Sequence, residues 1–181
     1  MDGPAGFGVG ATFIYSGATG GGLAQFVGTQ QLGNFGHSVA VLKDVDQDGY
    51  DEIIVGAIGE PPGGAAYLYS GSSGQLLREW HSPEVAALFG NFVRDAGDVE
   101  ADGVNHILVG ALSSDVIGNS RGALFVYSGR TGAELLIAGN PLGISGGRGD
   151  GLGDVNGDGH SDIVGTAGSD WVIAYSGADG S

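Results

Sequence analysis

The residues with the clearest chemistry in this chain are acidic and recur three times with one spacing. Each copy has carboxylate or amide side chains at loop positions 1, 3 and 5 and a glycine at position 6, over Asp44–Gly49, Asp98–Gly103 and Asp154–Gly159. Such a loop can surround a hard cation with oxygens, and the glycine permits the sharp turn that this requires. Oxygen-only ligands favour calcium over zinc or copper. The sequence therefore predicts calcium-binding loops.

The acidic loops belong to a longer repeat, because 54 residues separate Asp44 from Asp98 and 56 separate Asp98 from Asp154. A second motif has the same period: a short aromatic and β-branched run that ends in a Ser-Gly-x-x-Gly turn. It occurs at residues 10–20, 64–74, 122–132 and 170–180. These runs predict strands followed by tight turns. A further strand is expected after three of the turns, at 23–26, 76–80 and 135–137.

One repeat thus contains a strand, an acidic loop, a strand, a longer loop, a strand, a tight turn and a strand. Four antiparallel strands in about 50 residues are typical of one propeller blade. The predicted fold class is all-β, a β-propeller of four-stranded antiparallel blades with about three blades in the chain. We expect a single domain over residues 1–181, with a half blade at 10–28, blades at 34–84 and 88–141, and a partial blade at 145–181.

Ring closure needs more blades than the chain supplies, because propellers typically have 4–8. Either the chain forms a homo-oligomer, such as a dimer with about six blades in which half blades complete one another, or it is a fragment of a larger ring. Both alternatives remain open from the sequence.

Composition supports a folded, acidic protein. The chain has 181 residues, of which 39 are glycine and 41% are hydrophobic, so a core can form. Its formal net charge of −15 argues against nucleic acid as a partner. No apolar run approaches the ~20 residues of a membrane-spanning helix. The N-terminal residues lack the features of a signal peptide, so we expect either a cytosolic protein or an excised piece of a longer one.

Further motifs flank the acidic loops. Phe-Gly stands nine residues before the first two loops, at 35–36 and 89–90, and Val-Gly-Ala follows them, at 55–57 and 109–111. This order resembles the FG-GAP repeat of integrin α-subunit propellers and their bacterial relatives, over about residues 10–180. The third copy departs from it with Ser145-Gly146 and Gly165-Thr-Ala167, and Ile58 and Leu112 replace the proline of the name.

The resemblance implies a ligand set in which positions 1, 3, 5 and 9 supply side chains and position 7 a backbone carbonyl. The first site would use Asp44, Asp46, Asp48, Tyr50 and Glu52; the second Asp98, Glu100, Asp102, Val104 and His106; the third Asp154, Asn156, Asp158, His160 and Asp162. His106 offers nitrogen, a poor ligand for a hard cation. Calcium is therefore expected at the first and third sites, and the second stays open.

The resemblance also implies a non-catalytic, extracellular binding or adhesion module that calcium stabilises, by about 1–2 kcal/mol per site at millimolar concentration. The location would be secreted, periplasmic or cell-surface. The ligand, protein or carbohydrate, is not identified by the sequence, but the variable loops Ile58–Gly63 and Leu112–Arg121 could contact it. The alternative is a purely structural or assembly-forming element.

Other readings have weaker support. An EF-hand is excluded, because it needs glutamate at position 12, where Val55, Val109 and Gly165 stand. A carbohydrate-active enzyme would need two carboxylates outside the loops; Glu60, Asp115 and Asp170 are candidates, which we expect to be solvated instead. Trp80 and Trp171 could line a sugar site, but packing between blades is the expected role. The tripeptide Arg148–Asp150, which some integrins bind in their ligands, carries little weight in so glycine-rich a chain.

Overall fold

The computed structural model describes residues 8–116, 122–138, 144–167 and 171–181, and these residues form an all-β structure. The fold-class prediction is confirmed in this respect. The candidate carboxylate Asp170 and residues 117–121 of the expected recognition loop lie outside the described residues. The strands are β1 Ala11–Tyr15, β2 Gly22–Val27, β3 Phe35–Leu42, β4 Glu52–Ala57, β5 Ala65–Tyr69, β6 Leu76–His81, β7 Phe89–Gly97, β8 His106–Ala111, β9 Ala123–Tyr127, β10 Glu134–Ala138, β11 Ile144–Gly153, β12 Asp162–Ala167 and β13 Trp171–Tyr175.

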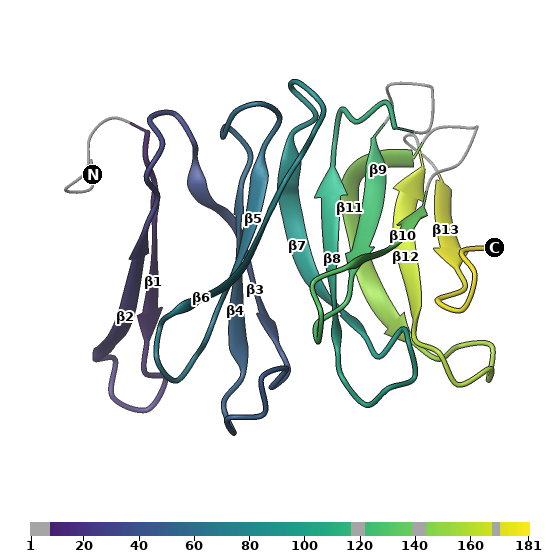
Figure 1. The fold of residues 1–181 in the computed structure, drawn as a ribbon, viewed down its shortest axis with the longest axis horizontal. Coiled ribbons are helices and arrows are strands. Elements are labelled where there is room, and N and C mark those ends of the chain that lie inside the picture. The colour runs from purple at the N-terminus through teal and green to yellow at the C-terminus, as the bar shows by residue number, and fades with distance from the viewer. Residues whose placement is uncertain (1–7, 117–121, 139–143, 168–170) are drawn as a thin grey trace.

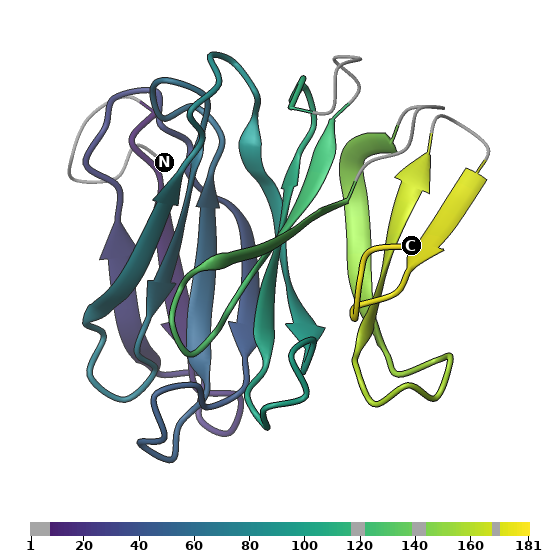
Figure 2. The same ribbon diagram turned by 45° about the vertical axis from the view of Figure 1, so that its right-hand side comes forward.

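The strands form four antiparallel sheets that follow one another along the chain. In the described residues β1 and β2 make a two-stranded sheet, β3–β6 and β7–β10 make four-stranded sheets, and β11–β13 make a three-stranded sheet. Consecutive strands are neighbours in each sheet, the up-and-down order of a propeller blade. The sheets stand side by side, with β1–β2 and β11–β13 at opposite ends (Figures 1 and 2).

The Phe-Gly motif begins the first strand of both four-stranded sheets and introduces an irregularity there. Phe35 pairs with Ala57, but the next pair is Ser38 with Gly56, so the register shifts within β3. Phe89 and Phe92 of β7 show the same shift against β8. Gly36 and Gly90 have φ of 86° and 84°, a backbone conformation that a Cβ atom disfavours. Glycine at this position is therefore required by the bulge.

Three hydrophobic clusters fill the spaces between successive sheets. Phe26, Phe35 and Tyr67 belong to the cluster between β1–β2 and β3–β6. The largest cluster, which includes Leu68 and Phe125, joins β3–β6 to β7–β10, and a third joins β7–β10 to β11–β13. Since each sheet packs only on its neighbours, stability in this architecture comes from the interfaces between sheets.

The two tryptophans have different environments. Trp80 of β6 is buried, lies 5.2 Å from Tyr127 between ring centroids, and donates a hydrogen bond from Nε1 to the carbonyl of Gly132 at 2.9 Å. The expected packing between blades is confirmed for this residue. Trp171 is 74% exposed, so the same expectation is wrong for it in this structure. Within the described part of the chain, no helix has the length and apolarity to cross a membrane.

Candidate metal centre

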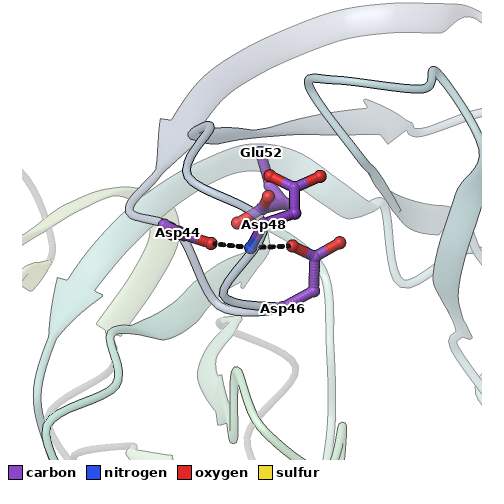
Figure 3. Close-up of side chains that lie close together, drawn as sticks. All are labelled: Asp44, Asp46, Asp48 and Glu52. Carbon is purple, nitrogen blue, oxygen red and sulfur yellow. Dashed lines mark hydrogen bonds between the residues drawn. The ribbon is translucent and has the colours of Figure 1, made fainter.

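The first acidic loop connects β3 to β4 and gathers four carboxylates. The side chains of Asp44, Asp46, Asp48 and Glu52 each offer an oxygen within 4.8 Å of the others (Figure 3). Among the described residues, these four side chains form the group of acidic residues whose geometry could hold a metal ion. Three come from the loop and Glu52 from the start of β4, so strand pairing fixes the fourth side chain relative to the others.

Backbone amides hold the loop in shape. Asp44 accepts hydrogen bonds from the N–H groups of Asp48 and Gly49, at 3.0 and 2.9 Å. Asp48 N–H also reaches the Asp46 carboxylate at 3.2 Å (Figure 3), and Asp48 accepts from the N–H of Tyr50 at 2.9 Å. Gly49 has a φ of 90°, and its counterparts Gly103 and Gly159 have φ of 81° and 92°. The sharp turn that the sequence predicted at position 6 is confirmed.

Glu52 is the most informative residue of the site. Its side chain is fully buried, and one oxygen, Oε2, accepts a hydrogen bond from the N–H of Val45 at 2.7 Å. The other oxygen, Oε1, is buried without a hydrogen-bond partner. Burial raises the pKa of Glu52 to about 7, against the lowering effect of the Val45 N–H, and the nearby Asp46, Asp44 and Asp48 raise it further. An orphaned buried carboxylate oxygen is costly, and a cation would satisfy it.

Two serines complete the first loop, and the sequence analysis did not assign them to it. Ser72 donates a hydrogen bond to Oδ2 of Asp48, and Ser70 approaches the same oxygen at 3.5 Å. Both belong to the Ser-Gly-x-x-Gly turn after β5. The common period of this turn and the acidic loop was the signal that could have indicated the contact.

The second loop, between β7 and β8, has the same backbone frame but different side-chain partners. Asp98 accepts from the N–H groups of Asp102 and Gly103, at 3.0 and 2.8 Å. Nε2 of His106 lies 3.0 Å from Oε2 of Glu100. Arg130 Nε donates to Asp102 Oδ2 at 2.8 Å, and this bond lowers the pKa of Asp102.

The third loop, between β11 and β12, also keeps the frame. Asp154 accepts from the N–H groups of Asp158 and Gly159, at 3.1 and 2.9 Å. Asn156 Nδ2 donates to Asp158 at 2.8 Å. Asp162 is buried, and its two oxygens accept from Val155 N–H at 2.9 Å and Gly177 N–H at 3.0 Å. Its carboxylate therefore fixes the loop to the neighbouring turn, and the predicted third ligand set stays a prediction.

The residues expected to supply backbone carbonyls differ in exposure. Tyr50 is 61% exposed, whereas Val104 is buried. His160 places Nδ1 2.7 Å from the carbonyl of Val99, and Ser161 N–H donates to the carbonyl of Asp98 at 2.9 Å. These two contacts join the third loop to the second, so adjacent loops support one another.

The candidate catalytic carboxylates do not form a pair in the described residues. Glu60 was expected to be solvated, and this is wrong: it is 3% exposed and accepts a hydrogen bond from the hydroxyl of Tyr67. Burial together with that bond raises the pKa of Tyr67. Asp115 is exposed, and its N–H donates to Glu84 at 3.1 Å. Glu60 is therefore a buried residue that the Tyr67 hydroxyl holds in place.

Parts of this chain are similar in sequence to known proteins. The FG-GAP repeat family matches residues 35–69, which contain the first acidic loop and strands β3–β5. Integrin alpha-5 of Xenopus laevis is 32% identical over 123 residues, which cover 62% of this chain and 11% of that protein. Integrin alpha-V of Gallus gallus is 32% identical over 103 residues, covering 51% and 10%. Integrin alpha-6 of Homo sapiens is 33% identical over 117 residues, covering 58% and 9%. The chain thus spans about a tenth of the length of these relatives.

Proposed function

We propose, from the premise that this chain is an integrin-like FG-GAP β-propeller domain, that it is a calcium-stabilised, non-catalytic adhesion or binding module outside the cytosol. The observation that carries the calcium part is the buried Oε1 of Glu52, which has no partner and lies beside three aspartates. Carboxylate oxygens at this density are the ligands that calcium prefers. The bound ion would supply a Coulombic attraction that the described protein atoms around Glu52 do not.

Calcium would act on stability through the strands on either side of the loop. Without an ion, repulsion among the four carboxylates opposes the pairing of β3 with β4. An ion that binds only the folded state adds RT ln(1 + [Ca]/Kd), or about 1.8 kcal/mol at 2 mM calcium and a Kd of about 10⁻⁴ M. That is a sizeable part of a total of about 5–15 kcal/mol.

Thermal unfolding in 2 mM CaCl₂ and in EDTA tests this proposal. We expect the midpoint to rise by about 3–7 °C with calcium, since 1 kcal/mol shifts a domain of this size by about 2–4 °C. MgCl₂ is the matched control, because magnesium demands a tighter octahedral site and should stabilise less. An unchanged midpoint in calcium would refute the proposal.

The proposed location rests on the calcium affinity that we assume. Extracellular calcium modules bind at about 10⁻⁴–10⁻³ M, a range in which cytosolic calcium would leave the loop empty. We therefore place the domain in a secreted, periplasmic or cell-surface protein. Fractionation of the native host into medium, cell surface, periplasm and cytosol, with the chain followed by a fused tag, tests this placement: recovery of the whole pool in the cytosol would contradict it.

The ligand would be a protein or a carbohydrate, bound through the loops at one edge of the sheets. Ile58–Gly63 and the described part of Leu112–Arg121 lie between the second and third strands of their sheets and differ in sequence. Glycan and protein arrays probed in calcium and in EDTA test the assignment, with Asp44→Asn as the matched variant. Absence of calcium-dependent binding on both arrays would count against a binding module.

The second candidate function is assembly, favoured by the exposed face of the first sheet. Phe13 and Tyr15 of β1 are 50% and 63% exposed, and their rings stack at 6.5 Å. Tyr67 and Phe125, the counterparts of Phe13, and Tyr127, a counterpart of Tyr15, are buried against the preceding sheet. A second copy of this chain, contributing a sheet at that face, would cover it in the same way.

Sedimentation velocity tests the assembly candidate. We expect a discrete dimer that the variant Phe13→Ser with Tyr15→Ser converts to monomer. Val85→Ser serves as a surface control, since Val85 is 82% exposed in a loop. A monomer at every accessible concentration would contradict assembly through copies of the chain.

A further inference from the structure

The second acidic loop differs from the first in one respect that bears on which loops take an ion. Its carboxylates at positions 3 and 5 already have cationic or proton-donating partners from the protein. We propose that this loop is closed without calcium, by His106 and Arg130 acting in place of the ion. This inference rests on the proposed function only in that the first loop is taken as the calcium-binding reference.

His106 occupies position 9, where the other loops have acids. In all three loops the side chain at this position accepts a hydrogen bond from the N–H of position 2: Glu52 from Val45 at 2.7 Å, His106 from Val99 at 3.4 Å, Asp162 from Val155 at 2.9 Å. For His106 the acceptor is Nδ1, so the ring proton stands on Nε2.

That proton points at position 3 of the same loop. Nε2 of His106 lies 3.0 Å from Oε2 of Glu100, and the His106 side chain is only 1% exposed. Glu100 therefore has a partner from within the loop, and histidine at position 9 supplies no oxygen. In the first loop, by contrast, Glu52 has its oxygen Oε1 buried and unpartnered.

Arg130 neutralises position 5. Its Nε donates to Oδ2 of Asp102 at 2.8 Å, and its Nη2 donates to the carbonyl of Asp102 at 3.2 Å. Arg130 stands two residues after Ser128, the phase at which Ser72 follows Ser70 in the preceding repeat. Beside the first loop this position thus carries the neutral hydroxyl of Ser72. Beside the second loop it carries the guanidinium of Arg130.

Among the described residues, Asp98 is the acid of this loop that has no hydrogen bond from a side chain, and its two oxygens accept backbone N–H groups. The formal charge of the four positions plus the turn residue is −4 in the first loop, from Asp44, Asp46, Asp48 and Glu52 with a neutral serine. In the second it is −2, from three acids and one arginine. A divalent ion therefore has less to neutralise and fewer oxygens to bind.

Calorimetric titration with CaCl₂ tests the inference with two matched variants, Asp44→Asn and Asp98→Asn. Both remove a charge at position 1, and both keep an oxygen for the backbone N–H groups. Asp44→Asn should lose one ion per chain, whereas Asp98→Asn should bind the wild-type number with a Kd within about twofold. Loss of one ion in Asp98→Asn would overturn the inference.

A gain of binding gives a second test. The double variant His106→Glu with Arg130→Ser gives the second loop the side chains of the first, and it should bind one more calcium ion than the wild type.

A third test, the EDTA arm, needs no calcium. In EDTA, Arg130→Ala should lower the urea midpoint more than Arg148→Ala, a change at an exposed arginine.

The outcomes separate this inference from the proposed function. If the wild type binds no calcium, the proposed function fails, and the EDTA arm alone decides the inference. Equal urea midpoints for Arg130→Ala and Arg148→Ala, or no additional ion in the double variant of a calcium-binding protein, would overturn it.

Discussion

Gly71 and Asp51 lie so close that a Cβ atom on the glycine would overlap with the carbonyl oxygen of the aspartate. Asp51 is position 8 of the first acidic loop, and Gly71 is the glycine of the turn after β5. The same overlap occurs between Gly129 and Asn105 and between Gly177 and Ser161. In each repeat, therefore, the acidic loop is packed against the tight turn by a contact that only glycine permits.

Gly71→Ala should destabilise the protein by roughly 1–3 kcal/mol or more, because the obstructing atom belongs to the backbone and cannot rotate away. Gly17→Ala is the matched control. Gly17 has the same place in the turn after β1, but no heavy atom lies within 4 Å of its ideal Cβ. Urea unfolding of the two variants should give a clear loss for Gly71→Ala and a change within about 0.5 kcal/mol for Gly17→Ala. Equal losses would mean that the close contact is not what constrains the glycine.

Glu52→Gln should separate the two roles of the glutamate. The amide oxygen can still accept the N–H of Val45, but the variant lacks the charge that repels the neighbouring aspartates. We expect the variant to unfold at an equal or higher temperature than the wild type in EDTA, and to lose most of the calcium stabilisation of about 1.8 kcal/mol. Differential scanning calorimetry with and without calcium measures both effects.

The control for Glu52→Gln is Asp51→Asn, which removes a carboxylate from the same loop. Asp51 pairs with Lys43 at 3.1 Å on the surface and is not among the four grouped carboxylates. Its calcium response should match that of the wild type. If Asp51→Asn lost the response as Glu52→Gln does, the effect would reflect net charge rather than coordination.

The raised pKa of Glu52, about 7 against the ordinary 4.5, gives the metal-free protein a defined pH dependence. Between these values the folded state holds a proton that the unfolded state releases, so the contribution of Glu52 to stability falls as pH rises through this window. In EDTA, the unfolding midpoint of the wild type relative to Glu52→Gln should therefore decrease from pH 5 to pH 7.5.

With calcium present the sign reverses, because the ion must displace that proton. The affinity for calcium should weaken as pH falls from about 7 to 5, and Glu52→Gln should lack this dependence. Calorimetric titrations at several pH values, in buffers of different ionisation enthalpy, would reveal the proton released. A pH-independent affinity would contradict a direct role for Glu52.

Trp80 should account for much of the stability of the interface between β3–β6 and β7–β10. Trp80→Ala removes the contact with Tyr127 and the bond to Gly132, and should cost about 3–5 kcal/mol. Trp80→Phe keeps an aromatic ring and should cost about 1 kcal/mol from the lost hydrogen bond. Trp171→Ala, at a 74% exposed side chain, is the control and should change stability by less than about 0.5 kcal/mol. Chemical denaturation followed by circular dichroism distinguishes these values.

The sequence pattern was sufficient to predict those features of the fold that depend on local contacts. The acidic loops, the strands around them and the tight turns after the aromatic runs were all predicted, because spacing and turn residues specify them within about ten residues. Glu60 was misjudged, because its burial depends on Tyr67, which lies on the next strand and gave no signal in the loop sequence.

The side-chain contacts of the second loop could not be predicted from the loop sequence. His106 was recognised as a poor ligand from its type, but its bond to Glu100 depends on the ring being held by Val99. Arg130 lies 28 residues from Asp102, and nothing in the loop sequence places a guanidinium there. Only the stacking of the turn over the loop brings these two residues together.

The order of residue types specifies the repeat, the loops where oxygens could surround a cation, the approximate ends of the strands and the all-β fold class. These properties follow from side-chain type, backbone freedom and period, which are local. Which carboxylates stay unpartnered depends on the folded chain, because desolvation and pairing involve atoms from other strands. Glu52 keeps a buried oxygen without a partner, whereas Asp162 and Glu100 have hydrogen-bond partners, and the pattern alone did not separate the three.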